Sequence, residues 1–221
     1  RLDADLVSMS DPRTASLERK YRFTSRVYDI LDWPWERRYQ KWRPRLVGDV
    51  DGRVLEAGVG TGQNLRFYPS EAEVHGIDLS EGMLTHARRR APAASCDVTL
   101  RKADALDLDH LEDRSFDWYI ATFLYCVLPD ELQPPALSEM ARVLAPGGRF
   151  RLVEMVYSGR FFPRLIQKIM SPYVEIVFGA RFDRRTPEHI ESNPTLEITG
   201  TRWLKEDTYL LLEGRRMERG S

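Results

Sequence analysis

The chain has 221 residues, of which 30% are charged, and its formal net charge is −1. This length suits a single domain with its own core, and the balanced charge gives no whole-chain reason to expect a nucleic acid partner. The two cysteines, Cys96 and Cys126, have no CxxC spacing and no neighbouring histidine cluster. We therefore expect no disulfide framework, no metal site and a cytoplasmic location.

The first predicted segment is a helical extension over residues 11–45, ahead of the core. Asp11 can cap a helix that Pro12 opens. An apolar face and a row of arginines lie on different sides of this helix. Two interpretations remain open: the helix packs over the binding site, or it lies on an anionic membrane surface with tryptophans at the interface. The apolar face consists of Leu17, Tyr21, Thr24, Tyr28 and Leu31.

Residues 46–155 are expected to form the core, because strand-like and helix-like stretches alternate along them. Such alternation predicts an α/β fold of Rossmann-like type, with a doubly wound, mostly parallel sheet and right-handed crossovers. The predicted strands cover 53–59, 72–80, 96–104, 116–125 and 149–156. The predicted helices are a short one that stops at Pro69, then 81–91 and 134–145.

Two further regions follow the core. Residues 156–190 form an apolar insert, and residues 191–217 contain two strand-like runs, 195–204 and 208–217. Such a pair, joined by a short charged link, predicts an antiparallel hairpin at one edge of the sheet. All four regions together are predicted to form one domain over residues 1–221.

The most informative short stretch is VLEAGVGTGQN, residues 54–64, because three glycines alternate directly after a buried strand. In open parallel sheets, ligands bind beyond the carboxyl ends of the strands, where the first turn offers backbone N–H groups to a carboxylate or phosphate. A dinucleotide fingerprint would need glycine where Gln63 stands, so this GxGxG after Glu56 is a different pattern. Structural glycines at an ordinary turn are the plainer alternative.

Two acids follow at later strand ends. Asp78 ends the second predicted strand and could accept hydrogen bonds from both hydroxyls of a ribose. Asp104 ends the third, where its neighbourhood could meet the edge of an adenine. Each acid alone could be a helix cap, but polar endings on three successive strands favour a ligand that contains a nucleoside.

These pieces, in this order, resemble the class I S-adenosylmethionine-dependent methyltransferases. The resemblance rests on VLEAGVGTG, GIDLSEGML, ADAL, SFDWYIATFLYCV and EMARVLAPGGRFRLVE. It implies S-adenosylmethionine as cofactor, S-adenosylhomocysteine as product, and a nucleophile held in line with the transferred methyl group. The cofactor-binding residues that it implies are Glu56, Gly58, Gly60, Thr61, Gly62, Asn64, Asp78, Leu79, Met83, Asp104, Ala105 and Thr122, with Tyr21 and Tyr28 closing over the cofactor.

The insert is unusually apolar for a surface segment. Its apolar residues approximate one side of a helix, and its basic residues outnumber its acidic ones. It could be a lid that only completes the core, or a basic-edged lid that admits a lipid chain and holds its phosphate. The apolar residues are Phe161, Phe162, Leu165, Ile166, Ile169 and Met170.

The motifs VYD and FLYCVLPD, with the insert, resemble a subset of the same family. This subset holds bacterial phosphatidylethanolamine N-methyltransferases and relatives that act on quinones or small thiols. It implies a phospholipid substrate, peripheral contact with an anionic membrane surface, and no metal. Tyr125 would approach the amine and Glu154 would accept a proton or hold the ammonium, although Glu154 could be an ordinary strand-end acid. The implied substrate-binding residues are Tyr21, Tyr125, Arg160, Tyr173 and Arg181.

Three functions remain open from the sequence. The first is a phospholipid N-methyltransferase that converts phosphatidylethanolamine stepwise towards phosphatidylcholine. The second is a soluble methyltransferase for a quinone or another small lipophile, and the third is a cofactor-binding partner protein without catalysis. A nucleic acid substrate is disfavoured, because FLYCVLPD stands where an NPPY-type motif would be and no basic domain is appended.

Overall fold

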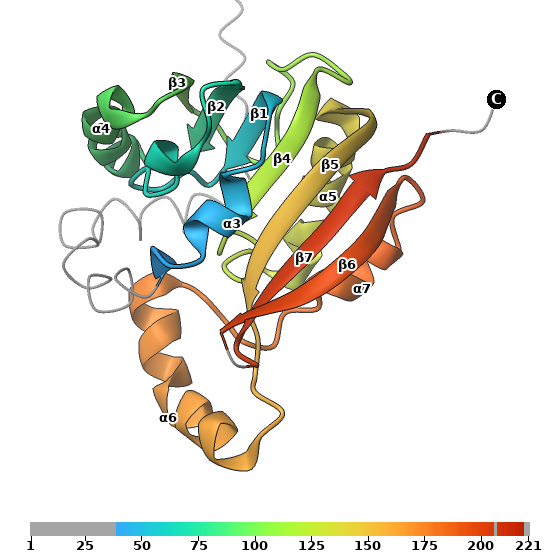
Figure 1. Ribbon diagram of the computed structural model, residues 1–221. Helices are drawn as coiled ribbons and strands as arrows, with labels where there is room; N and C mark the ends of the chain where they lie inside the picture. Colours follow the sequence, from blue (N-terminus) through green and yellow to red (C-terminus); the bar gives the residue numbers. More distant parts are fainter. Residues whose placement is uncertain (1–38, 206, 219–221) are drawn as a thin grey trace, which may run out of the picture.

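The computed structural model describes residues 39–205 and 207–218. Most of the expected N-terminal helix, including Tyr21 and Tyr28, lies outside the described residues. The described chain forms a seven-stranded sheet in the order β3-β2-β1-β4-β5-β7-β6 (Figure 1). The strands are β1 Gly52–Ala57, β2 Ala72–Asp78, β3 Asp97–Lys102, β4 Phe116–Thr122, β5 Leu144–Met155, β6 Leu196–Lys205 and β7 Tyr209–Arg216.

The sheet is mostly parallel, as predicted. β1 pairs in parallel with β2 and β4, and β3 and β5 extend the parallel sheet on either side. β7 runs antiparallel to both β5 and β6, so the predicted hairpin forms one edge of the sheet. The strand order reverses between β1 and β4, which opens a crevice beyond the carboxyl ends of these two strands.

Helices cover both faces of the sheet and give it two cores. On one face, α5 and α7 pack with Phe150 and Leu152 of β5, and on the other, α3 and α4 pack with Val54 of β1. Because both faces of the central strands are covered, these strands read as continuous apolar runs. The helices are α3 Arg43–Val47, α4 Glu81–Arg90, α5 Gln133–Val143, α6 Phe161–Phe178 and α7 Thr186–Glu191, with 3-10 turns η1 Leu65–Phe67, η2 Ala91–Ala93 and η3 Asp130–Leu132.

Local sequence signals explain two of the helix ends. Ser80 caps α4 by accepting a hydrogen bond from the Met83 backbone N–H, and α6 ends at Gly179, which adopts a left-handed conformation with φ 75°. One expectation was wrong in extent: the helix predicted between the glycine turn and Pro69 is only the single 3-10 turn η1. There the Asn64 side chain bonds to Glu56.

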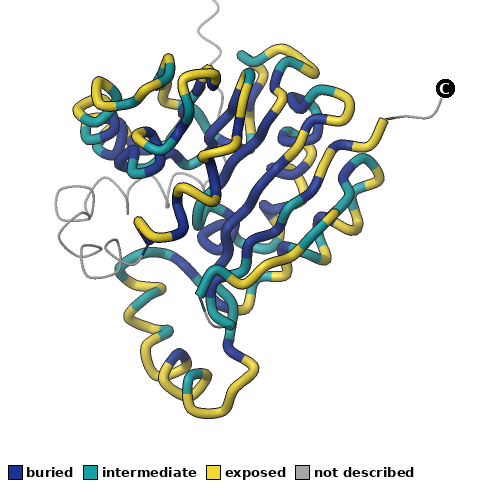
Figure 2. Tube along the Cα trace, in the orientation of Figure 1, coloured by how far each residue is buried: buried dark blue, intermediate teal, exposed yellow. Residues whose placement is uncertain are grey.

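The insert contains the long helix α6, which projects from the body of the molecule below the sheet (Figure 1). Much of its surface is exposed (Figure 2). Gln167 is the buried residue of α6, so this helix contributes little to the core. Within the described residues, no helix is both long and apolar enough to cross a membrane.

Candidate active site

A cavity of about 610 Å³ opens beyond the carboxyl ends of β1, β2 and β4. One half is polar and is lined by the glycine turn and the strand ends. The other half is apolar and is lined by the segment after β4, by α6 and by the hairpin. The structure brings most of the predicted cofactor residues into the polar half: Glu56, Gly58, Gly60, Thr61, Asn64, Asp78, Leu79, Met83, Asp104, Ala105 and Thr122.

The glycine turn serves two different purposes. Gly60 has φ +56° and lines the cavity, and a Cβ added there would meet no protein atom closer than 3.9 Å. Gly62 has φ +81° and does not line the cavity; its added Cβ would lie 2.9 Å from Leu65 and 3.0 Å from the Cα of Ala87. The assignment of Gly62 to cofactor binding is therefore corrected, because this glycine permits close packing against α4.

Glu56 is a buried carboxyl group at the centre of a hydrogen-bond network. Its Oε1 accepts from the side-chain amide of Asn64 at 2.7 Å, and its Oε2 accepts from the hydroxyl of Tyr68 at 3.0 Å. Arg43 of α3 donates to the side-chain amide oxygen of Asn64 at 2.5 Å. Burial raises the pKa of Glu56 to about 7, against the lowering effects of Asn64, Tyr68 and Arg43. A cationic group bound beside Glu56 would favour its ionised form.

Asp78 is held at the end of β2 by two backbone groups. One carboxyl oxygen accepts from the Gly60 N–H at 2.9 Å and the other from the Ser80 N–H at 2.8 Å. Burial raises the pKa of Asp78 to about 6, although both hydrogen bonds favour the ionised form. Each oxygen keeps a further lone pair, so the carboxylate could accept from two neighbouring hydroxyls at the cavity wall.

A polar and an apolar surface meet after β3. Asp104 accepts a hydrogen bond from the Leu106 N–H at 3.0 Å, and Leu79, Met83 and Ala105 line the same half of the cavity. The Met83 and Ala105 side chains are buried. This arrangement could take a flat aromatic base, with its faces on apolar side chains and a polar edge towards Asp104.

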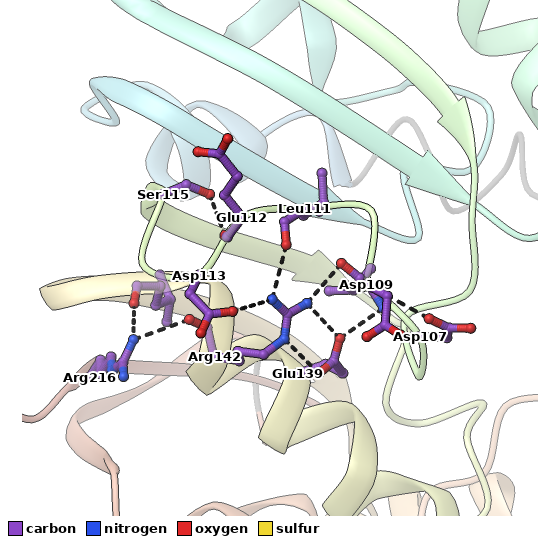
Figure 3. A network of polar contacts seen from close by, with 11 residues as sticks. Asp107, Asp109, Leu111, Glu112, Asp113, Ser115, Glu139, Arg142 and Arg216 are labelled. Carbon is purple, nitrogen blue, oxygen red and sulfur yellow. Dashed lines mark hydrogen bonds and ion pairs between the residues drawn. The ribbon is translucent and has the colours of Figure 1, made fainter.

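Arg142 of α5 holds the connection between β3 and β4 in place (Figure 3). Its guanidinium donates to the carbonyl oxygens of Leu108 and Leu111, at 2.8 and 2.9 Å. It also bonds to Glu139, at 2.9 Å from two nitrogens, and to Asp113 at 2.6 Å. Because this connection begins after Lys102 and contains Asp104 and Ala105, the network supports one wall of the polar half.

The apolar half contains three aromatic rings in mutual contact. The ring centroids of Tyr39 and Phe123 lie 5.3 Å apart, those of Tyr39 and Tyr209 lie 5.5 Å apart, and those of Phe123 and Tyr209 lie 5.7 Å apart. All three residues line the cavity. Phe123 has φ 60°, a strained conformation for a residue with a side chain, and strain of this kind is common at functional sites.

The structure does not bring either predicted catalytic residue to the cavity. Tyr125 is fully buried, and its hydroxyl lies 3.3 Å from that of Tyr119. Glu154 is also buried, accepts from the hydroxyl of Thr186 at 3.4 Å, and is absent from the cavity lining. Both catalytic assignments are corrected, because the two side chains point into the core.

Of the other predicted substrate-binding residues that the structure describes, one lines the cavity and two do not. Tyr173 of α6 lines the cavity. Arg160 stands at the N-cap of α6 and does not line it. Arg181 also stays outside the cavity lining and pairs with Asp183, at 2.8 Å, and with Glu175, at 3.8 Å. The two arginines are therefore not placed to bind a molecule inside the cavity.

Several cavity residues were missed from the sequence. Arg43, Tyr39 and Gln63 lie near motifs but carry no pattern of their own, while Lys205 and Tyr209 come from the hairpin. The two hairpin residues reach the cavity beside β1 and β4 only because of the order of the strands in the folded sheet. For Tyr209 the available signal is its position at the start of the second hairpin strand, opposite Lys205.

Comparison with known proteins gives consistent results. A methyltransferase domain family matches residues 54–148. The chain is 35% identical to a phosphatidylethanolamine N-methyltransferase of Cereibacter sphaeroides, over 76% of the chain and 83% of that protein. It is 34% identical to a demethylmenaquinone methyltransferase of Thermus thermophilus, over 71% of the chain and 76% of that protein.

The fold also matches solved structures. The complex of DhpI with SAH aligns with a TM-score of 0.69 at 21% identity, and covers 93% of this chain and 98% of that one. The match to the methyltransferase domain and to the two relatives shows the family: this chain belongs to the S-adenosylmethionine-dependent methyltransferases. It is an enzyme that transfers a methyl group from that cofactor.

Proposed function

We propose that the enzyme methylates the amine of phosphatidylethanolamine and of its methylated intermediates, towards phosphatidylcholine. The observation that carries the proposal is the contact of Tyr39, Phe123 and Tyr209 in the apolar half of the cavity. Aromatic faces attract ammonium groups, and attract them more strongly where water is excluded. A substrate that gains methyl groups on nitrogen and becomes a quaternary ammonium suits such a set of rings.

The polar half fits the cofactor. Gly60 leaves open space at the cavity wall, Glu56 suits the cationic amino group of the methionine part, and Asp78 suits the two ribose hydroxyls. Asp104 and Met83 would meet the adenine, and Thr122 would lie below the sulfonium. When bound, S-adenosylmethionine supplies a methyl group that is already activated.

This part of the proposal has a direct test. Replacing Asp78 with alanine removes the carboxylate that would accept from both ribose hydroxyls, so affinity for the cofactor should fall about tenfold or more. Calorimetric titration with S-adenosylhomocysteine measures the affinity. Unchanged affinity would remove Asp78 from the cofactor site.

The apolar half is suited to an amine rather than to a group that needs a base. Among the described residues that line the cavity, the carboxylates are Glu56, Asp78 and Asp104, and all three belong to the polar half. Loss of hydration in the apolar half lowers the pKa of an entering ammonium group and favours the neutral, nucleophilic amine. The attraction to the aromatic faces acts in full on the quaternary ammonium product, which has no proton to lose. Methylation at carbon of a quinol would instead need a base beside its hydroxyl.

The hairpin offers a cation for the lipid phosphate. Lys205 lines the cavity at the end of β6, close to Thr208 and across the hairpin from Tyr209. An ammonium group at this place could hold a phosphate while the amine reaches the aromatic rings. The lipid head group would then be oriented by contacts to its phosphate and to its amine.

The experiment is incubation of the enzyme with radiolabelled S-adenosylmethionine and mixed liposomes that contain phosphatidylethanolamine, followed by thin-layer chromatography of the extracted lipid. Label in mono-, di- or trimethylated head groups supports the proposal and gives the number of steps. The Asp78→Ala variant supplies the background. No labelled lipid, with cofactor binding confirmed, would overturn it in favour of a quinone or another small lipophile, as the 34% identity to the demethylmenaquinone methyltransferase suggests.

A further inference from the structure

One side of α6 is an exposed apolar surface, which we call the outer face: Phe161, Phe162, Leu165, Ile169 and Ile176. Phe161 is 74% exposed, Ile169 69% and Ile176 73%. Figure 2 shows most of the helix in the colour of exposed residues. Large apolar side chains gathered along one helix in this way mark a surface that contacts a partner.

The outer face continues into the cavity. Ile166, Met170 and Tyr173 follow helical spacing beside it, and each is exposed and also lines the cavity. Val174 and Phe178, further round the helix, line the cavity as well. The apolar surface therefore runs without interruption from the outside of α6, over this rim, to the apolar half of the cavity.

A basic stripe borders the apolar surface. Arg164 and Lys168 follow helical spacing on the side of α6 away from the rim, and Arg160 stands at its N-cap. The acidic residue of the helix is Glu175, near the other end. An apolar face edged by arginine and lysine suits the boundary of an anionic lipid layer, where apolar groups enter the acyl region and cations meet the head groups.

The helix is fixed to the body of the enzyme, so its orientation is defined. Gln167 accepts from the Ser158 N–H at 2.7 Å and donates to the carbonyl oxygen of Val156 at 3.1 Å and to the hydroxyl of Thr208 at 3.3 Å. These bonds tie α6 to the end of β5 and to the hairpin. The distance between the mouth of the cavity and a surface bound to the outer face would therefore be fixed.

We propose that α6 docks the enzyme on an anionic lipid bilayer through its outer face, with the rim of Ile166, Met170 and Tyr173 opening towards the bilayer. The acceptor would pass from the bilayer over this rim without crossing water. Docking itself stands on the geometry and charge of α6, whereas passage of the acceptor rests on the proposed function.

The first test is flotation with vesicles of phosphatidylcholine, with and without phosphatidylglycerol, over a series of salt concentrations. The wild-type enzyme should float with the anionic vesicles, and less of it as salt increases, because salt screens the basic stripe. The double variant Ile169→Ser/Ile176→Ser should bind about tenfold more weakly or worse. Trp203→Ser, which changes an exposed apolar residue on β6, is the matched control and should float like the wild type.

A second readout separates docking from chemistry. On short-chain phosphatidylethanolamine dissolved as monomers, the double variant should keep wild-type activity, while it loses activity on vesicles. Circular dichroism checks that the variant is folded. If the wild type methylates no lipid in either form, the proposed function falls, yet the flotation result still decides the docking proposal.

Three results would overturn docking. The first is a wild type that stays out of the vesicle fraction at every salt concentration, and the second is a double variant that floats as the wild type does. The third is a wild type that sediments as a dimer and does not float, with the double variant a monomer, because the outer face would then join two copies of the chain.

Discussion

Gly60 and Gly62 have the same type of backbone conformation but different surroundings. At Gly60, an alanine would carry mainly the cost of its left-handed conformation, about 1 kcal/mol, and its methyl group would occupy the cavity wall. At Gly62, the added methyl group would also press on Leu65 and on the backbone of Ala87, so the loss should be about 3 kcal/mol or more.

The two substitutions should therefore separate in two measurements. Urea unfolding should show the larger loss of stability for Gly62→Ala, whereas calorimetry with S-adenosylhomocysteine should show the larger loss of affinity for Gly60→Ala. Equal losses of stability would mean that α4 does not pack closely against Gly62 in solution.

The sequence predicted the positions of residues at or just after the ends of β2 and β3 better than those after β4. Asp78 ends β2 and Asp104 follows β3 by two residues, and both could be placed because the carboxyl ends of parallel strands meet at one edge of a sheet. Tyr125 could not, because β4 ends at Thr122 and Phe123 turns the chain with a positive φ, so strand alternation no longer applies. Tyr125 then points into the core and Phe123 towards the cavity.

Among the elements, the connection between β3 and β4 is tied to α5 mainly through the side chain of Arg142, together with Glu139, which accepts from the Leu108 N–H at 2.8 Å. Replacing Arg142 with methionine would remove the hydrogen bonds of its guanidinium and leave the carbonyl oxygens of Leu108 and Leu111 without that donor. We expect a loss of about 2–4 kcal/mol in unfolding free energy, and faster hydrogen exchange over residues 104–113.

The matched control is Arg88→Met. Arg88 pairs with Glu81 on the exposed surface of α4, where an ion pair contributes about 0.5 kcal/mol or less. Similar losses for the two variants, measured by urea unfolding, would show that Arg142 acts only as a surface charge.

The existence of most elements could be predicted, and their packing could not. Periodicity identified α4, α5 and the strands, and the hairpin followed from two short runs joined by a charged link. The same periodicity identified α6 as an apolar helix but left open whether it completes the core. That question depends on contacts across the chain, such as those of Gln167 with Val156 and Thr208.

For the whole molecule, Glu154 links stability to pH. Burial raises its pKa from 4.5 to about 8, although the Thr186 hydroxyl and the Tyr125 backbone favour the ionised form. Between these two values the folded protein keeps a proton that the unfolded chain has lost, so stability falls as pH rises through this window. The shift corresponds to at most about 5 kcal/mol, all of it lost above the folded pKa.

Replacing Glu154 with glutamine should remove this dependence. Glu56 and Asp78 titrate in both proteins, so the difference between the two proteins isolates Glu154. Urea unfolding at about pH 5 and about pH 9 should show that the wild type loses more stability than the variant over this interval. Parallel pH dependence would mean that Glu154 is not buried as an acid.

The fold class followed from alternation along the chain, because a parallel sheet has few permitted topologies. The residues that make up the site could be predicted from the sequence only in part. Arg43 approaches Asn64 from α3, and Tyr39 meets Tyr209 from the far end of the chain, with their hydroxyls 3.2 Å apart. Contacts at such sequence separation depend on the final order of strands, which local pattern does not encode.

The division of the cavity has a consequence for how such enzymes diversify. The polar half is built mainly from residues within 54–148, the part that matches the methyltransferase domain, whereas much of the apolar half comes from α6 and the hairpin. If the acceptor binds in the apolar half, as we propose, mutations in α6 are expected to change the acceptor while the cofactor is bound as before. The same methyl-transfer chemistry would then serve different acceptors, in line with the names of two relatives of this chain, one for a phospholipid and one for a quinone.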